Sequence, residues 1–148
     1  MPEQENKATD NVKELLAEAR KEPIASFLNM QLLELQLGYA RVMLKVLPEY
    51  ENFNGVTFGG ITMAVADQAF GYAVNSVNRP NVASQFNIYF IAAVKAGDEL
   101  TAEGRVVKSG RRVSIAEMTV TNQDGKLIAR ATGTTIPLTS THSKSTDP

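Results

Sequence analysis

The spacing of apolar and polar residues changes along the chain and predicts a different element in each part. Residues 11–21 carry leucines and alanines on one face of a predicted helix, which Asp10 can cap, and Pro23 can start a second helical turn. Between residues 33 and 46 apolar and polar residues alternate, which is typical of a strand, and Gly38 marks an expected bulge or turn within it. The first third of the chain is therefore predicted to be helical and then extended.

A long helix and a series of strands follow. Residues 48–55 form a predicted polar loop, residues 60–77 form a long helix, and the sequence NRPN at 78–81 ends that helix. Strand-like runs come next at 82–94, 99–110, 111–122 and 127–138, separated by turn-forming residues. This order of elements predicts an α+β fold in which the later strands pair antiparallel.

The long helix has no polar face. Its larger apolar residues lie on both sides of the helical projection, and the small residues Ala64, Ala66, Ala69, Gly71 and Ala73 fill the rest. A helix that is apolar nearly all round is buried, and the simplest enclosure in this chain is a curled antiparallel sheet. The small residues would let such a sheet approach the helix axis closely.

A single acid, Asp67, lies in the middle of this helix, and no lysine or arginine is within one helical turn of it. Burial of an unpaired carboxylate costs several kcal/mol or raises its pKa. Asp67 is therefore expected to meet a partner from elsewhere in the fold or to face a cavity, where it could act as a general base or nucleophile. The alternative is a structural aspartate that accepts hydrogen bonds from a loop backbone or reaches solvent.

Two glycines, Gly59 and Gly60, stand where the long helix begins. Backbone N–H groups at a helix start lack intrahelical partners, and the helix dipole adds positive potential there, so this position can bind the oxygen of a polarised carbonyl. The alternative is a tight turn into the helix. On a straight helix Asp67 lies about 10 Å further along the axis, so two chains related by a dyad are needed to bring one chain's acid to the other's helix start.

Composition and charge narrow the possible functions. The formal net charge of −1 provides no basic field for nucleic acid, and the absence of cysteine excludes disulfides and thiolate chemistry. The one histidine, His142, leaves no source within one chain for a Ser-His-Asp triad or a multi-histidine metal site. We expect no metal, and no glycine loop typical of ATP or NAD binding is present in the sequence.

One domain is predicted over residues 10–138, preceded by a disordered segment at 1–9 and followed by a flexible tail at 139–148. The polar, acidic N-terminal segment resembles neither a signal peptide nor a transit peptide. No apolar run reaches the ~18 uncharged residues that a membrane span requires. We therefore expect a cytoplasmic protein without membrane contact.

The stretch ENFNGVTFGGITMAVADQAFGYAVNS, at residues 51–76, resembles the core motif of the hotdog-fold thioesterases of the phenylacetate-degradation (PaaI-like) type. That motif is Asn-x-x-Gly-x-x-His-Gly-Gly, followed by apolar residues and Ala-Asp in the central helix. The stretch FNIYFIAAVKAGDELTAEGRVVKSGRR is also similar, and the resemblance covers about residues 23–137. It implies a hotdog fold, a long helix wrapped by an antiparallel sheet, in dimers or tetramers that hydrolyse acyl-CoA thioesters at the dimer interface.

The resemblance also implies roles for individual residues. Asp67 would be the catalytic carboxylate, acting as general base on water or as nucleophile. The backbone N–H of Gly59, or of Gly60 if the register shifts by one, would polarise the thioester carbonyl from the partner subunit. Asn52 matches the asparagine of the family's loop, which helps to place the attacking water or the carbonyl.

A serine or threonine on the next strand often assists in this family. Here Ser84 is the candidate, with Ala83 and Gln85 as the alternatives in register. The chain departs from the motif at one position, because Phe58 stands where the family has histidine. This change implies a slower enzyme, a reshaped site, or a non-catalytic protein that binds acyl-CoA. A hotdog dehydratase is the third possibility, although such enzymes pair an acid with a histidine and His142 lies in the tail.

Coenzyme A, which would be part of the substrate and not a separate cofactor, must also be bound. Lys108, Arg111 and Arg112 surround a glycine turn, and their charges suit the nucleotide phosphates. The alternative is a solvated hairpin turn whose charges protect a sheet edge.

Overall fold

The structure is a computed structural model that describes residues 2–138. Its helices are α1 (Pro2–Ala19), α2 (Pro23–Phe27), the short 3₁₀ helix η1 (Pro48–Tyr50) and the long α3 (Gly59–Val77). Its strands are β1 (Gln31–Gln36), β2 (Tyr39–Lys45), β3 (Asn81–Phe90), β4 (Glu99–Ser109), β5 (Ser114–Thr121) and β6 (Leu127–Pro137).

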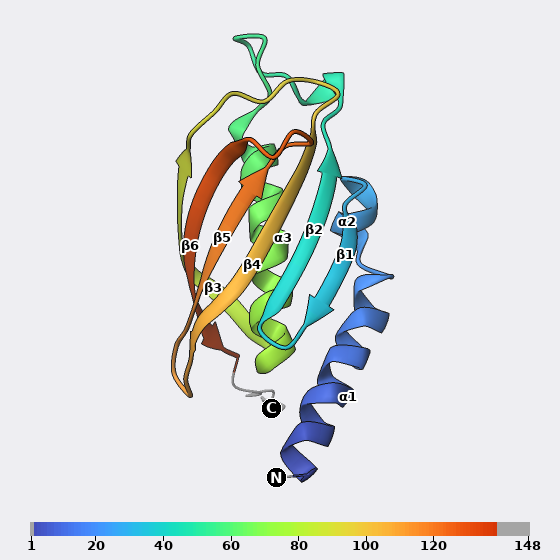
Figure 1. Cartoon of the computed structure of the whole chain (residues 1–148), viewed down its shortest axis with the longest axis vertical. Helices are drawn as coiled ribbons and strands as arrows, with labels where there is room; N and C mark the ends of the chain where they lie inside the picture. Colours follow the sequence, from blue (N-terminus) through green and yellow to red (C-terminus); the bar gives the residue numbers. More distant parts are fainter. Residues whose placement is uncertain (1, 139–148) are drawn as a thin grey trace, which may run out of the picture.

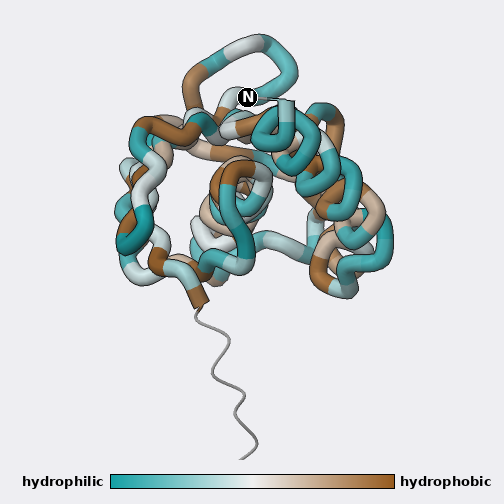
Figure 2. The backbone as a smooth tube through the Cα atoms, turned by 90° about the horizontal axis from the view of Figure 1, so that it is seen from below, coloured by the Kyte–Doolittle hydropathy of each residue, from teal (hydrophilic) through white to brown (hydrophobic). Residues whose placement is uncertain are grey.

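The strands form one antiparallel sheet of six, in the order β1-β2-β4-β5-β6-β3. The sheet curls around α3, which runs along its concave side (Figure 1). In the end-on view of Figure 2, α3 lies in the middle, with strands on one side and α1 on the other. The predicted α+β class and the placement of the long helix against the concave side of a curved antiparallel sheet are therefore confirmed.

Close approach between α3 and the sheet depends on glycines in the strands as well as small residues in the helix. A Cβ added to Gly104 of β4 would lie 2.7 Å from the carbonyl oxygen of Ala69, and one added to Gly133 of β6 would lie 2.5 Å from the ring of Phe70. Both distances are shorter than real Cβ contacts. Only glycine therefore lets these two strands lie this close to the helix without a shift of the chain.

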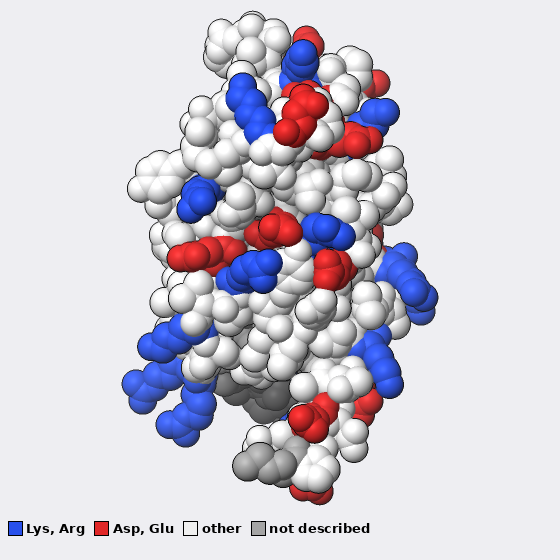
Figure 3. Space-filling view, viewed as in Figure 1, with Lys and Arg blue, Asp and Glu red and all other residues white. Residues whose placement is uncertain are grey.

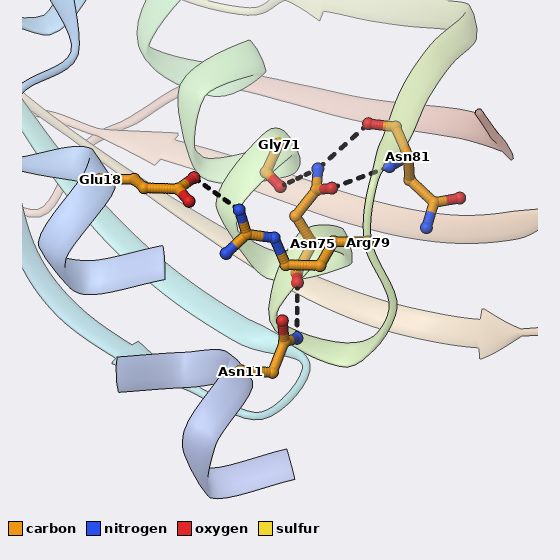
Figure 4. A network of polar contacts seen from close by, with 6 residues as sticks. All are labelled: Asn11, Glu18, Gly71, Asn75, Arg79 and Asn81. Atoms are coloured by element: carbon orange, nitrogen blue, oxygen red, sulfur yellow. Dashed lines mark hydrogen bonds and ion pairs between the residues drawn. The ribbon is translucent and has the colours of Figure 1, made fainter. Parts of the chain in front are cut away.

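Helix α1 is fastened to the C-terminal end of α3 by polar contacts (Figure 4). The side-chain amide of Asn11 donates to the carbonyl of Asn75 at 2.9 Å and to that of Ser76 at 2.8 Å. Glu18 forms an ion pair with Arg79, just beyond the helix. Because the last carbonyls of a helix have no intrahelical partner, these contacts satisfy the end of α3 and set the position of α1.

The loop after α3 is held by the helix as well. The side chain of Asn75 donates to the carbonyls of Gly71 at 2.8 Å and Asn81 at 3.2 Å, and it accepts a bond from the N–H of Asn81 at 2.8 Å (Figure 4). The chain can therefore leave α3 and enter β3 along a defined path.

Two predictions about secondary structure need correction. Residues 2–9, predicted to be disordered, belong to α1, because their glutamates, glutamine, lysine and alanine are good helix formers that extend the following turns. The alternating run at 33–46 is two strands joined at Gly38, which has a positive φ of 74° and so makes a turn. The predicted tail at 139–148, with His142, lies outside the described residues.

No helix within residues 2–138 combines the length and the apolar character needed to cross a bilayer. The cytoplasmic location stays a prediction.

Candidate active site

The acid predicted to be catalytic lies on a part of α3 that the protomer leaves uncovered. Asp67 and Met63 are exposed, and Ala64 and Gly71 on the same side of the helix are half-buried. The prediction that α3 is buried on all sides is therefore wrong for this stripe, because the sheet surrounds only part of the helix. The small and apolar residues of the stripe are typical of a surface that a further element covers.

Asp67 accepts no hydrogen bond and forms no ion pair with any residue between 2 and 138. The alternative of an aspartate held by a loop backbone thus finds no support in the structure, whereas the alternative of a side chain that reaches solvent agrees with the exposure of Asp67 in this protomer. Although the side chain as a whole is exposed, nearby protein removes part of the water around its carboxyl group, and this desolvation raises the pKa of Asp67. An unpaired carboxyl group with a raised pKa is suited to accept a proton or to attack an electrophile.

The start of α3 presents free N–H groups. Phe58 occupies the N-cap position and its side chain makes no capping hydrogen bond. The N–H of Ile61 donates to the carbonyl of Phe58 at 3.0 Å, whereas the N–H groups of Gly59 and Gly60 donate to no described residue. These two donors, at the positive end of a 19-residue helix, can bind a developing oxyanion.

Two aromatic rings lie against this helix start. A Cβ on Gly60 would come within 2.2 Å of the Phe58 ring, and one on Gly59 within 3.3 Å of the Phe90 ring. Phe58 is 58% exposed, so its ring is packed on the glycine backbone but not enclosed. An apolar ring therefore occupies the position at which the family motif has an imidazole.

A cavity of about 370 Å³ opens beside the same helix start and is lined by Asn52, Thr57, Gly59, Thr62 and Phe90 among others. Asn52 uses its side-chain oxygen to accept bonds from the N–H groups of Asn54 at 2.9 Å and Val56 at 3.4 Å, which shapes its own loop. Its side-chain NH₂ donates to no residue that the structure describes, so it can point a donor at a bound oxygen. Asn52 and Gly59 thus line the same cavity, and their roles in the reaction stay predictions.

Thr57, Thr62 and Phe90 were not predicted to belong to this site. Thr57 is buried, and its hydroxyl oxygen has no hydrogen-bond partner among the described residues. Phe90 ends β3 and is 31 positions from Gly59, so no local pattern connects the two. A sequence signal was available only for Thr57 and Thr62, which flank the predicted helix start.

The acid and the helix start of one chain do not converge. Gly59 and Asp67 are eight residues apart on one continuous helix, which places them about 12 Å apart along its axis. One small reacting group cannot contact both. That a second chain completes the site stays a prediction.

The model of the Thioesterase superfamily matches residues 54–129, the segment that contains most of this cavity, α3 and the strands β3 to β5. The chain belongs to this superfamily.

Relatives of this thioesterase agree with the PaaI-like assignment. The acyl-coenzyme A thioesterase PaaI of Escherichia coli is 32% identical over 105 residues, which cover 71% of this chain and 75% of that protein. The structure of E. coli PaaI superposes with a TM-score of 0.82 at 29% identity, over 90% of this chain and 95% of that one. A Streptococcus mutans protein solved with acetyl-CoA bound has a TM-score of 0.70 at 30% identity, covering 73% and 87%. The predicted PaaI-like hotdog thioesterase is confirmed, and with it a thioester hydrolase.

In this thioesterase Ser84 is an exposed residue of the edge strand β3. Ala83 pairs with Thr135 and Gln85 with Thr134, so Ser84 is the extra residue of a β-bulge. Its hydroxyl donates to the carbonyl of Thr134 at 3.2 Å. A bulge redirects the side chain at that point. The part that Ser84 plays in the reaction stays a prediction.

The basic residues predicted to bind phosphate form a separate group. Lys108, Arg111 and Arg112 are exposed at the β4–β5 hairpin, where blue side chains gather at the lower left of Figure 3. They make no ion pair with another residue of the described chain. The hairpin lies at the opposite end of the sheet from the start of α3 (Figure 1). One protomer therefore does not bring these charges to the cavity beside Asn52.

No cluster of three or more potential metal ligands occurs within residues 2–138. Whether the enzyme works without metal or cofactor stays a prediction.

Proposed function

We propose that this thioesterase hydrolyses small or medium acyl-CoA thioesters to the free acid and CoA, at sites formed between two chains. One observation carries the proposal: among residues 2–138 Asp67 has no bonding partner, and it lies about 10–12 Å along the helix from the N–H groups of Gly59 and Gly60, which donate to no described residue. The relatives named above add the substrate class, because one is an acyl-coenzyme A thioesterase and another was solved with acetyl-CoA.

A second copy is the occupant we propose for the half of the uncovered stripe that lies between the start of α3 and Asp67. In the described part of the chain, strand β3 is a ten-residue edge of the sheet, and no other strand pairs with its outer side. The end of β3 and the residue that follows it carry exposed apolar side chains, with Tyr89 67% and Ile91 52% exposed. Twofold pairing along β3 would continue the sheet and would set the two α3 helices against each other. The predicted tetramer would join two such dimers and is not needed to complete a site.

In the proposed reaction, the thioester carbonyl lies between the Gly59 and Gly60 amides of one chain and the Asp67 carboxylate of the other. Asp67 either removes a proton from water as the water attacks, or attacks the carbonyl itself and forms an anhydride that water then hydrolyses. In both routes a C–O bond forms and the C–S bond breaks. Water supplies the new oxygen of the acid, and its proton ends on the CoA thiol or the solvent.

The helix-start amides would stabilise the oxyanion in either route, and Asn52 would add a side-chain donor to it. Lys108, Arg111 and Arg112 would bind the phosphates of CoA. In a twofold dimer the basic hairpin of one chain can approach the helix start of the other, which one protomer does not allow.

Hydrolysis of an acyl-CoA panel, followed by thiol detection of free CoA, tests the proposal. We expect turnover by the wild type and at least about a 100-fold loss in Asp67→Asn, the lower range for a positioned acid–base group. Equal rates in the two proteins would contradict the assignment of Asp67.

The second candidate function is acyl-CoA binding without hydrolysis, which the ring of Phe58 at the helix start favours. Acyl-CoA binding by the wild type without release of CoA would support it. A Phe58→His variant that then gains turnover would show that the missing imidazole is what limits catalysis.

A further inference from the structure

A second cavity, of about 430 Å³, lies between α3 and the N-terminal helices. Leu15 and Ala19 of α1 and Pro23 of α2 line it on one side, and Gln68, Gly71 and Tyr72 of α3 line it on the other. No step of the proposed hydrolysis uses this cavity, and no sequence pattern predicted it.

On α3 the cavity begins at Gln68, beside the uncovered stripe that contains Asp67. Gln68 follows Asp67 directly, and Gly71 lies one helical turn further on the same side. A Cβ added to Gly71 would meet no heavy atom within 4 Å. The space over Gly71, one helical turn from Asp67 on the same side of α3, is therefore open among the described residues.

The charged residues Glu18, Lys21 and Glu22 are also part of the wall, and three of its polar side chains, those of Glu22, Gln68 and Tyr72, bond to one another. The hydroxyl of Tyr72 donates to Glu22 at the turn between α1 and α2, and the Gln68 amide donates to Glu22 and to the Tyr72 oxygen, each at 2.7 Å. Tyr72 is 7% exposed, and burial, followed by the hydrogen bond and charge of Glu22, raises the pKa of its hydroxyl. Because these groups already have partners, an apolar chain buried against them leaves no new unsatisfied donor.

Helix α1 forms a fixed wall of this cavity. The bonds from Asn11 and the Glu18–Arg79 ion pair attach it to the end of α3 (Figure 4). Along α3 the residues that line the cavity run from Gln68 to Asn75, which is about 10 Å. The contacts of α1 therefore set the width of the cavity and the end of α3 sets its length.

We propose that this cavity receives the acyl chain of the substrate, and that α1 and Gly71 set which acyl groups the enzyme accepts. The inference rests on the proposed function, because that function places the thioester carbonyl at Asp67. The acyl group then leads toward the C-terminal end of α3, away from the half of the stripe that a second copy would cover. The expected ligand is an unbranched aliphatic acyl chain longer than acetyl.

Two substitutions narrow the cavity from opposite sides. Gly71→Leu adds bulk from α3 and improves helix propensity by about 0.8 kcal/mol, so the helix is expected to persist. Ala19→Leu adds the same side chain from α1, away from the uncovered stripe. Ala17→Leu is the matched control, since Ala17 is exposed on α1 and does not line the cavity.

Binding of CoA and of S-hexyl-CoA, a thioether that the enzyme cannot hydrolyse, is measured by calorimetry. Each methylene that becomes fully buried tightens binding about fourfold, so we expect the wild type and Ala17→Leu to bind S-hexyl-CoA at least about tenfold more tightly than CoA. Gly71→Leu and Ala19→Leu are expected to lose most of this difference while their affinity for CoA stays within about twofold. The kcat/KM ratio of hexanoyl-CoA to acetyl-CoA is expected to fall by a similar factor.

The inference is overturned if both narrowing variants keep the full preference for S-hexyl-CoA, or if they lose CoA and S-hexyl-CoA binding equally. It is also overturned if the wild type shows no such preference. A wild type that has the preference and loses it in both variants, but releases no CoA from any thioester, supports the acyl cavity and contradicts the proposed hydrolysis.

Discussion

Subunit complementation tests whether each active site takes its acid and its oxyanion donors from different chains. One variant, Asp67→Asn, lacks the acid and keeps the helix start. The other, Asn52→Ala, keeps the acid and lacks a donor beside the helix start. The two are co-expressed in equal amounts with different affinity tags so that mixed assemblies form.

The expected activity follows from the separation of the two groups along α3. Each variant alone is expected to keep about 1% of wild-type turnover, since loss of an acid–base group or of one oxyanion donor costs at least about 100-fold. With sites shared between chains, half of the acids and half of the helix starts are intact. Random pairing then makes about one quarter of the sites fully intact, and the mixture should have about 25% of wild-type activity.

Steady-state release of CoA is measured on the mixture and on each variant purified alone, and light scattering confirms that all three have the same oligomeric state. Purification through both tags in succession selects the assemblies that contain both variants. If the doubly tagged assembly stays near 1%, every site uses the acid and the donors of one chain. The argument from the separation of Gly59 and Asp67, about 12 Å along α3, would then be wrong.

Three further predictions follow from particular contacts. Desolvation raises the pKa of Asp67 above its ordinary 3.8, so kcat/KM should fall as the pH drops through that raised pKa. At a pH above the raised pKa, Asp67→Asn should have a higher melting temperature than the wild type. Below pH 3.8 the two melting temperatures should agree, because the carboxyl is protonated in both the folded and the unfolded chain. The double variant Arg111→Ala, Arg112→Ala should raise KM for acyl-CoA, most clearly at low salt, while turnover of an acyl-pantetheine without the nucleotide stays unchanged. Gly104→Ala should lower the free energy of unfolding in urea by about 1–3 kcal/mol, because its Cβ would meet the backbone of Ala69 at 2.7 Å; an unchanged denaturation midpoint would contradict this close approach.

Local patterns were sufficient for most of the secondary structure. The long apolar helix, the loop before it and the strands after residue 80 follow from periodicity, glycine turns and the break at NRPN, because these features act within a few residues. The motif around Asn52, Gly59 and Asp67 identified the family and put the candidate residues on the loop and helix where the structure has them. Disorder at residues 2–9 was predicted wrongly because low hydrophobicity was given more weight than helix propensity.

The sequence by itself therefore determined the elements, the hotdog class and the identity of the candidate acid. Only the tertiary structure decided that Asp67 lies on an uncovered stripe, that Phe90 contacts the helix start, and that α1 leaves a cavity beyond Gly71. An apolar or small residue has the same signature in sequence whether a strand, a ligand or a second chain covers it. Which of these it meets depends on how far the sheet curls and where α1 is anchored, and both are set by contacts between residues far apart in the chain.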